Sequence, residues 1–203
     1  MASPVTIQPS TIDAYIEQNA ATANRGTTIN LNATESPGQN RYSLVKFDFS
    51  AFVPAGATIT LATLSLYCLA TASGRTIGVY RLLRTDWVEM EATWNVFKTG
   101  SNWGTAGALN TSTDYTTTDA ATAASVAVGQ WLNETVTAQV QTALDSVGGV
   151  AHFLIKDTGA DAYVANGWSS RDNTTAANRP KLYIEYTVRG ATPTGASFLL
   201  RMI

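Results

Sequence analysis

One segment restricts the fold of this chain more than any other. Residues Thr58–Leu69 alternate between apolar and polar or small side chains. This alternation places one set of side chains on one face of a β-strand, whereas a helix would spread the same set around its axis. The expected buried set is Ala62, Leu64, Leu66 and Cys68, and the opposite set is Thr63, Ser65 and Tyr67. A long strand with one apolar face needs a second layer to cover that face.

Segments of the same character lie on both sides of this strand. In residues 42–49, Val45, Phe47 and Phe49 point one way, and a turn at residues 54–57 leads into the next strand. The other expected strands are residues 13–16, 28–32, 76–83, 150–156 and 181–188. Many short strands separated by turn-rich loops are typical of an antiparallel β-sandwich, here a jelly-roll-like one.

A helical period occurs in one stretch, at Val136, Val140, Ala143 and Leu144. We expect Thr137 to cap its start and the pair Gly148 and Gly149 to end it. Residues 101–124 are rich in Thr, Ala, Gly and Asn and are interpreted as a long connection. The prediction is therefore an all-β chain with one short helix. One domain covers residues 1–188, and a small-residue linker with an apolar C-terminal tail follows at 189–203.

Charge and composition exclude several functional classes. Charged residues make up only 14% of the chain, with a net charge of −2 and no cluster of Lys and Arg. A soluble domain averages about 25% charged residues, and a nucleic-acid binder carries a basic patch, so no nucleic-acid partner is expected. The single cysteine, Cys68, cannot form an intramolecular disulfide. No apolar run is long enough to cross a membrane.

Several short motifs follow one another in a recognisable order. They are residues 13–16, 24–26, 43–48 and 54–67, then Trp87-Val88-Glu89, Thr93-Trp94-Asn95, Ser169-Ser170-Arg171-Asp172 and residues 179–186. As a set they resemble the DNRLRE-type domain, a β-sandwich family related to disaggregatase repeats and to some carbohydrate-binding modules. The resemblance covers about residues 6–188 and implies a non-catalytic module. Asp172 stands where the family usually has Glu.

The residues that could carry catalysis also fit structural roles. Asp86, Glu89 and Glu91 surround Trp87 and could supply the two carboxylates of a glycosidase. The lone histidine, His152, has no partners for a triad. Because the resemblance is to non-enzymes, we expect no enzyme activity. The expected structural residues are Trp87, Glu89, Trp94, Arg171, Asp172 and Arg179: the two tryptophans close one end of the sandwich, Glu89 binds a loop amide or an arginine, and Arg171 binds a carboxylate or backbone carbonyls.

Aromatic residues and oxygen-rich loops suggest two kinds of binding site. Trp103, Tyr115 and Trp168 lie in loop-like contexts, where an exposed ring could stack on a sugar. Trp131 is expected in the core instead, together with Trp87 and Trp94. We expect no cofactor and no metal site of recognisable spacing. A structural calcium ion held by residues 157–161 and Asn166 is the alternative.

The apolar C-terminal tail leads to a prediction about partners. Phe198, Leu199, Leu200, Met202 and Ile203 are large apolar side chains that would dock on a partner or on the sandwich itself. With no export segment at the N-terminus, this predicts a bacteriophage virion accessory protein, such as a capsid decoration protein or head fibre. It would be made in the host cytoplasm, form a homo-oligomer and bind a capsid or tail assembly. The alternative is an extracellular carbohydrate-binding module that contacts surface glycans.

Overall fold

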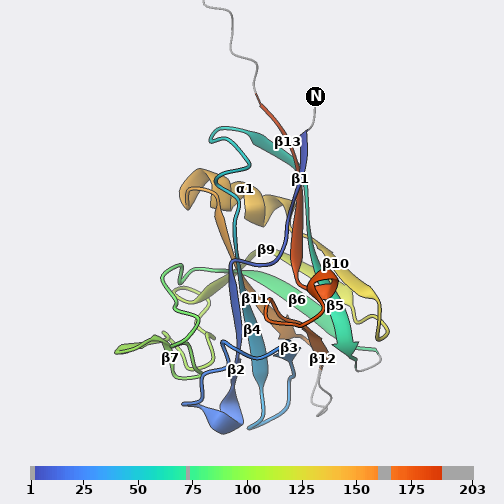
Figure 1. Cartoon of the computed structure of the whole chain (residues 1–203). Helices are drawn as coiled ribbons and strands as arrows, with labels where there is room; N and C mark the ends of the chain where they lie inside the picture. Colours follow the sequence, from blue (N-terminus) through green and yellow to red (C-terminus); the bar gives the residue numbers. More distant parts are fainter. Residues whose placement is uncertain (1–2, 72–73, 160–165, 189–203) are drawn as a thin grey trace, which may run out of the picture.

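Two antiparallel β-sheets contain most of the strands in the computed structural model, which describes residues 3–71, 74–159 and 166–188 (Figure 1). The first sheet runs in the order β1-β13-β5-β12-β3, and β10 pairs with β5 outside that path. Its strands are β1 (Ser3–Ile7), β3 (Asn30–Ala33), β5 (Thr58–Ala70), β10 (Trp131–Thr135), β12 (Asn166–Ser169) and β13 (Lys181–Thr187). The expected all-β sandwich class is confirmed.

The second sheet has five strands in the order β2-β4-β11-β6-β9. They are β2 (Ile12–Glu17), β4 (Arg41–Asp48), β6 (Thr76–Leu82), β9 (Tyr115–Ala124) and β11 (Val150–Asp157). A small hairpin of β7 (Val96–Lys98) and β8 (Ser101–Asn102) lies to one side of this sheet (Figure 1). The short elements are η1 (Gln18–Ala20), α1 (Thr137–Ser146) and η2 (Ala176–Asn178). Among the described residues, no helix is long and apolar enough to span a bilayer.

The main core lies between the two sheets, as the alternation in β5 predicts. Leu64 and Leu66 of β5 face Val45 and Phe47 of β4, and all four side chains are fully buried. Ala62 and Cys68 complete the inner face of β5. The period-two pattern therefore identified both which strands form and which side of each one is buried.

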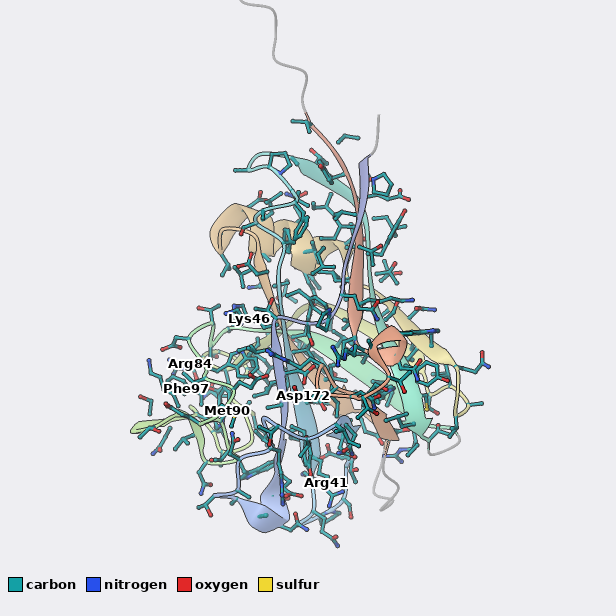
Figure 2. The ribbon with its side chains drawn as sticks, in the orientation of Figure 1. Arg41, Lys46, Arg84, Met90, Phe97 and Asp172 are labelled. Carbon is teal, nitrogen blue, oxygen red and sulfur yellow. The ribbon has the colours of Figure 1, made fainter. Side chains whose placement is uncertain are left out.

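A second core covers the outer face of the second sheet, which the sequence did not reveal. Leu44 and Leu154 alternate with residues of the main core, so they point away from it. The segment 83–114 lies over them and contributes Trp87, Trp94 and Trp103. At its rim, the guanidinium of Arg84 lies over the ring of Phe97, 4.9 Å from the centroid (Figure 2). The expectation that Trp87 and Trp94 close an end of the sandwich is therefore wrong: they pack on the back of a sheet.

Helix α1 covers one end of the main core through Val140, Ala143 and Leu144. Its N-cap is Val136 and not Thr137, whose hydroxyl accepts a hydrogen bond from the backbone N–H of Ala62 at 2.9 Å. The expected C-terminal end is confirmed, because the helix ends at Ser146. Gly148 and Gly149 follow with positive φ of 67° and 86°, a conformation that glycine adopts without strain.

Six strands were not expected, and one of them, β9, replaces the second half of the expected connection at 101–124. The other five are β1, β7, β8, β10 and β12. Strand β9 has Thr or Ala at most positions, and its side chains are largely exposed or half-buried. It therefore lacks the apolar alternation by which strands are recognised. It forms because β6 offers a free edge, to which it pairs from Thr76 to Leu82.

The face assignment of β5 leads to a test with two neighbouring residues. Leu64→Ala should lower the free energy of unfolding by about 2–5 kcal/mol, because it leaves a cavity in the main core. Thr63→Ala, on the outer face, should change it by about 1 kcal/mol or less. Urea denaturation measures both values. Similar losses in the two variants would contradict the assignment.

Candidate functional site

The three aromatic residues expected to stack on sugars are buried. Trp103 is 4% exposed, and its indole N–H donates to the backbone oxygen of Thr93 at 2.9 Å. Trp168 is 2% exposed within the main core, and Tyr115 is 9% exposed at the edge of the second core. The exposure expected for these rings is wrong, because Trp103 lies in segment 83–114, which packs on the second sheet, and Trp168 and Tyr115 lie in the strands β12 and β9. None of the three presents an open ring face to a ligand.

Trp131, expected in the core, lies instead on the outer face of the first sheet. Leu132 on the same strand is buried in the main core, so Trp131 on the neighbouring position points outward and is half-buried. The same alternation turns the polar set of β5 and part of β13 outward. We call this surface the Trp131 face; its residues are Thr63, Ser65, Tyr67, Trp131, Asn133, Lys181 and Tyr183.

Strand register brings the aromatic and basic groups of this face together. Trp131 pairs directly with Tyr67, and their rings meet edge-on with centroids 5.3 Å apart. The ammonium of Lys181, from β13 on the other side of β5, lies 3.8 Å from the centroid of the Trp131 ring. An aromatic pair with a cation on one ring is thus assembled from three strands. Trp131 and Lys181 lie 50 positions apart in the sequence, so no local motif announces them.

Polar groups continue the face along β5. The hydroxyl of Ser65 donates to the side-chain oxygen of Asn133 at 2.7 Å. The phenol of Tyr183, which pairs with Thr63, donates to the carboxylate of Glu185 at 2.6 Å, and this bond raises the pKa of Tyr183. Rings beside hydroxyl, amide and ammonium groups are the elements with which proteins bind sugars.

A network of hydrogen bonds and an ion pair joins β2 to the loops that carry Glu89 and Arg171. We call this network the polar clasp; its residues are Ser10, Asp13, Glu89 and Arg171. Glu89 accepts from the backbone N–H of Asp13 at 2.9 Å and lies 3.6 Å from a guanidinium nitrogen of Arg171. Arg171 also donates to the backbone oxygen of Thr11. The side chain of Asp13 accepts from Ser10 at 2.6 Å and from the backbone N–H of Arg171 at 2.9 Å. Glu89 therefore contacts a loop amide and an arginine, and Arg171 contacts a carboxylate and a backbone carbonyl.

Two further residues of the expected structural set act within a neighbouring loop. Arg179 donates to the backbone oxygen of Asn173 at 2.9 Å. Asp172 lies 3.9 Å from Arg171, and its backbone N–H donates to the hydroxyl of Ser170 at 3.1 Å. These contacts close the turn between β12 and β13, which brings the Ser-Arg-Asp motif against the loop that carries Glu89.

The acid and base candidates do not converge on a common point. Asp86 is paired with Lys98 at 2.6 Å, and Glu91 accepts from the backbone N–H of Thr99 at 2.7 Å. His152 accepts from the indole N–H of Trp87 at 3.1 Å, and burial lowers its pKa to about 4. Each group therefore has its own structural partner.

The loop considered for calcium contains an ion pair. The carboxylate of Asp157 lies 2.7 Å from the Nε of Arg75 and accepts from Asn166 at 3.2 Å and from the backbone N–H of Gly159 at 2.9 Å. Residues 160–165, including Asp161, lie outside the described residues. Within the described part of the chain, no three His, Cys, Asp or Glu side chains lie together as metal ligands would.

Comparison with known proteins gives a partial family match. A family model described as carbohydrate-binding module family 96 matches residues 4–96, just under half of the chain. No curated protein matches the sequence. The chain is a carbohydrate-binding-module-like β-sandwich, similar to that family from β1 to β6. The match includes Tyr67 and ends before Trp131 and Lys181. The finer resemblance to the DNRLRE-type domain stays a prediction.

The clasp leads to a test of pH dependence. Burial raises the pKa of Asp13 from 3.8 to about 7, so its stabilising contribution is fully present below about pH 3.8 and falls as the pH rises through 7. Asp13→Asn cannot ionise and escapes this loss. Between pH 4 and pH 7.5, the variant should therefore gain stability relative to the wild type, on the order of 2–4 kcal/mol.

Urea denaturation at a series of pH values measures this difference. Asp86→Asn is the control, because its ion pair with Lys98 lowers the pKa of Asp86 and keeps its titration below this window. Parallel curves for Asp13→Asn and the wild type would contradict a buried, protonated Asp13.

Proposed function

We propose that this chain is a non-catalytic carbohydrate-binding module that binds a polysaccharide on the Trp131 face. The observation that carries the proposal is the group of Trp131, Tyr67 and Lys181 on the outer face of the first sheet. The similarity to carbohydrate-binding module family 96 supports the class of ligand. The separate structural partners of Asp86, Glu91 and His152 support a binding role in place of catalysis.

Both ring stacking and hydrogen bonding would contribute to ligand binding on this face. A pyranose ring has an apolar face of C–H groups that packs on an aromatic side chain, and its hydroxyls need polar partners at the rim. Trp131 would supply the stacking surface. Lys181, whose flexible side chain can swing away from the ring, would donate to a hydroxyl, and the exposed side chain of Asn133 offers a further polar group.

The length of the face favours a chain over a single sugar. Tyr183 pairs with Thr63, and Thr63 lies four residues along β5 from Tyr67. Four residues of a strand span about 13 Å, so aromatic groups stand at both ends of a stretch longer than one pyranose ring. The ligand would lie along β5 and contact the rings at two separated positions.

The virion role has no support in the structure or the comparisons. It rests on the apolar residues of 189–203, which lie outside the described residues. It stays a prediction, as do the homo-oligomer, a capsid or tail partner and the location of the protein.

Affinity electrophoresis tests the proposal with gels that contain xylan, galactomannan, alginate or pectin. At least one polysaccharide should retard the wild-type protein, and Trp131→Ala and Tyr67→Ala should each weaken that binding about tenfold or more, since an aromatic contact contributes about 1–3 kcal/mol when buried. Lys181→Ala should weaken it less.

Phe52→Ala is the matched control. Phe52 is also an exposed ring, but its backbone oxygen accepts from Tyr186, which pairs with Ile59, eight residues along β5 from Tyr67. This variant should bind as the wild type does. Retardation that survives both Trp131→Ala and Tyr67→Ala, in proteins shown to be folded, would refute binding by the Trp131 face.

A further inference from the structure

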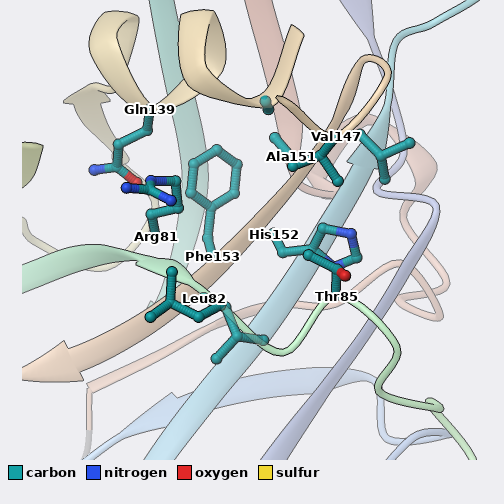
Figure 3. A pocket seen from close by; sticks show the side chains of 11 residues that line it. Arg81, Leu82, Thr85, Gln139, Val147, Ala151, His152 and Phe153 are labelled. Atoms are coloured by element: carbon teal, nitrogen blue, oxygen red, sulfur yellow. The ribbon is translucent and has the colours of Figure 1, made fainter. Parts of the chain in front are cut away.

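An apolar surface lies at the end of the molecule where β13 and the described part of the chain end (Figure 1). Helix α1 covers one side of this end of the main core, over Phe153 and Ala151 (Figure 3). The loop between β4 and β5 borders another side, and residues 51–56 of that loop carry no polar side chain. All of them except Val53 are exposed, and Phe52 is 52% exposed.

The end of β13 extends this surface. Tyr186 is half-buried against the main core, and its hydroxyl donates to the backbone oxygen of Phe52 at 3.2 Å. Val188 directly follows β13 and is 56% exposed. Adjoining exposed apolar groups of this kind mark a surface that another segment or molecule covers. We call this surface the end patch; its residues are Ala51, Phe52, Pro54, Ala55, Tyr186 and Val188.

The chain itself supplies an apolar segment that is attached at this surface. The described residues end at Val188, and residues 189–197 separate Val188 from Phe198. Nine residues cover at most about 30 Å when extended, so Phe198 and its successors can reach the end patch from their own attachment point. Within residues 198–203, every side chain except that of Arg201 is large and apolar.

A carboxylate at the border of the end patch matches the one charge of this segment. Asp145 is exposed on α1 and accepts from the side-chain amide of Gln141 at 3.0 Å. Gln141 in turn donates to the backbone oxygen of Ala57 at 3.3 Å, which places Asp145 beside the loop that carries Phe52. In the part of the chain that the structure describes, no lysine or arginine lies within 4.0 Å of Asp145. Arg201 has the opposite charge.

We propose that residues 198–203 bind to the end patch of their own chain. Their apolar side chains cover Phe52 and Val188, and Arg201 is attracted to Asp145. The tether favours this occupant over a second copy of the chain, because a connection of this length holds the segment at an effective concentration of about a millimolar. The tail therefore completes the cover of the main core at the end that α1 leaves partly open.

Nuclear Overhauser spectra of the wild-type full chain give the first test. Cross-peaks should join the ring protons of Phe52 to methyl protons of Leu199, Leu200 or Ile203. In a mixture of isotope-labelled and unlabelled protein, these cross-peaks should arise within one chain. Cross-peaks found only between chains would show that a second copy binds, and would overturn the proposal. The absence of any cross-peak from the Phe52 ring to these methyl groups would overturn it as well.

Disulfide formation between introduced cysteines is an independent test. Ala55→Cys places a thiol in the end patch, and Ser197→Cys places one just before the apolar segment. This pair should form an intrachain disulfide roughly tenfold faster than Met90→Cys paired with Ser197→Cys. Met90 is the control because it is 56% exposed and lies away from the end of β13 (Figure 2). Cys68 is 2% exposed and stays in place, and the chain without added cysteines controls for its reaction.

A change within the tail separates docking from the tether alone. Leu199→Ser combined with Leu200→Ser removes apolar contacts but keeps the connection, so it should slow the disulfide between positions 55 and 197 about tenfold. Thr192→Ser combined with Thr194→Ser, a matched change in the connection, should leave the rate unchanged. An equal rate in the two double variants would overturn the proposal. The spectra of the wild-type chain decide the matter even if a variant does not fold.

Discussion

The rest of the structure depends on the burial of one face of β5. This strand pairs with three others, β13, β10 and β12, and its inner side chains lie at the centre of the main core. Because side chains alternate along a strand, burying Leu64 and Leu66 forces Ser65 and Tyr67 outward. The same constraint turns Trp131 on β10 away from the core, opposite Tyr67. The strand register therefore fixes the main core and the Trp131 face together. A slip of one residue would turn the buried side chains outward and the outer side chains into the core.

Several of the few charged residues of the chain are buried. Asp13 lies in the clasp that joins β2 to two loops, Asp157 is paired with Arg75, and Glu134 points from β10 toward the main core. Burial raises the pKa of Glu134 to about 7, as it does for Asp13. The Trp131 face is left to aromatic and neutral polar side chains with one lysine, a composition suited to ligands rich in hydroxyl groups.

Sequence reasoning succeeded where a pattern is local. The alternation in β5 and β4 predicted both the strands and their buried faces, and the helical period with its final glycines predicted α1. It failed where partners are distant. Strand β9 forms by pairing with β6, and its own composition is that of a loop. Trp103 looks exposed between Asn102 and Gly104, yet it is covered because segment 83–114 packs on the back of a sheet.

The candidate site was missed for the same reason. Trp131, Tyr67 and Lys181 come from three strands and meet only through register, which no single-sequence pattern specifies. Glu89 and Arg171 were named from their side-chain chemistry as structural residues, but the sequence does not reveal that they lie 3.6 Å apart.

The most direct test of the account follows the indole N–H signals of the five tryptophans by NMR while a bound oligosaccharide is titrated. If the outer face of the first sheet binds the sugar, the Trp131 signal should move, and the signals of Trp87 and Trp103, which are hydrogen-bonded in the second core, should stay. Movement of the Trp103 or Trp168 signal with Trp131 unchanged would contradict the account.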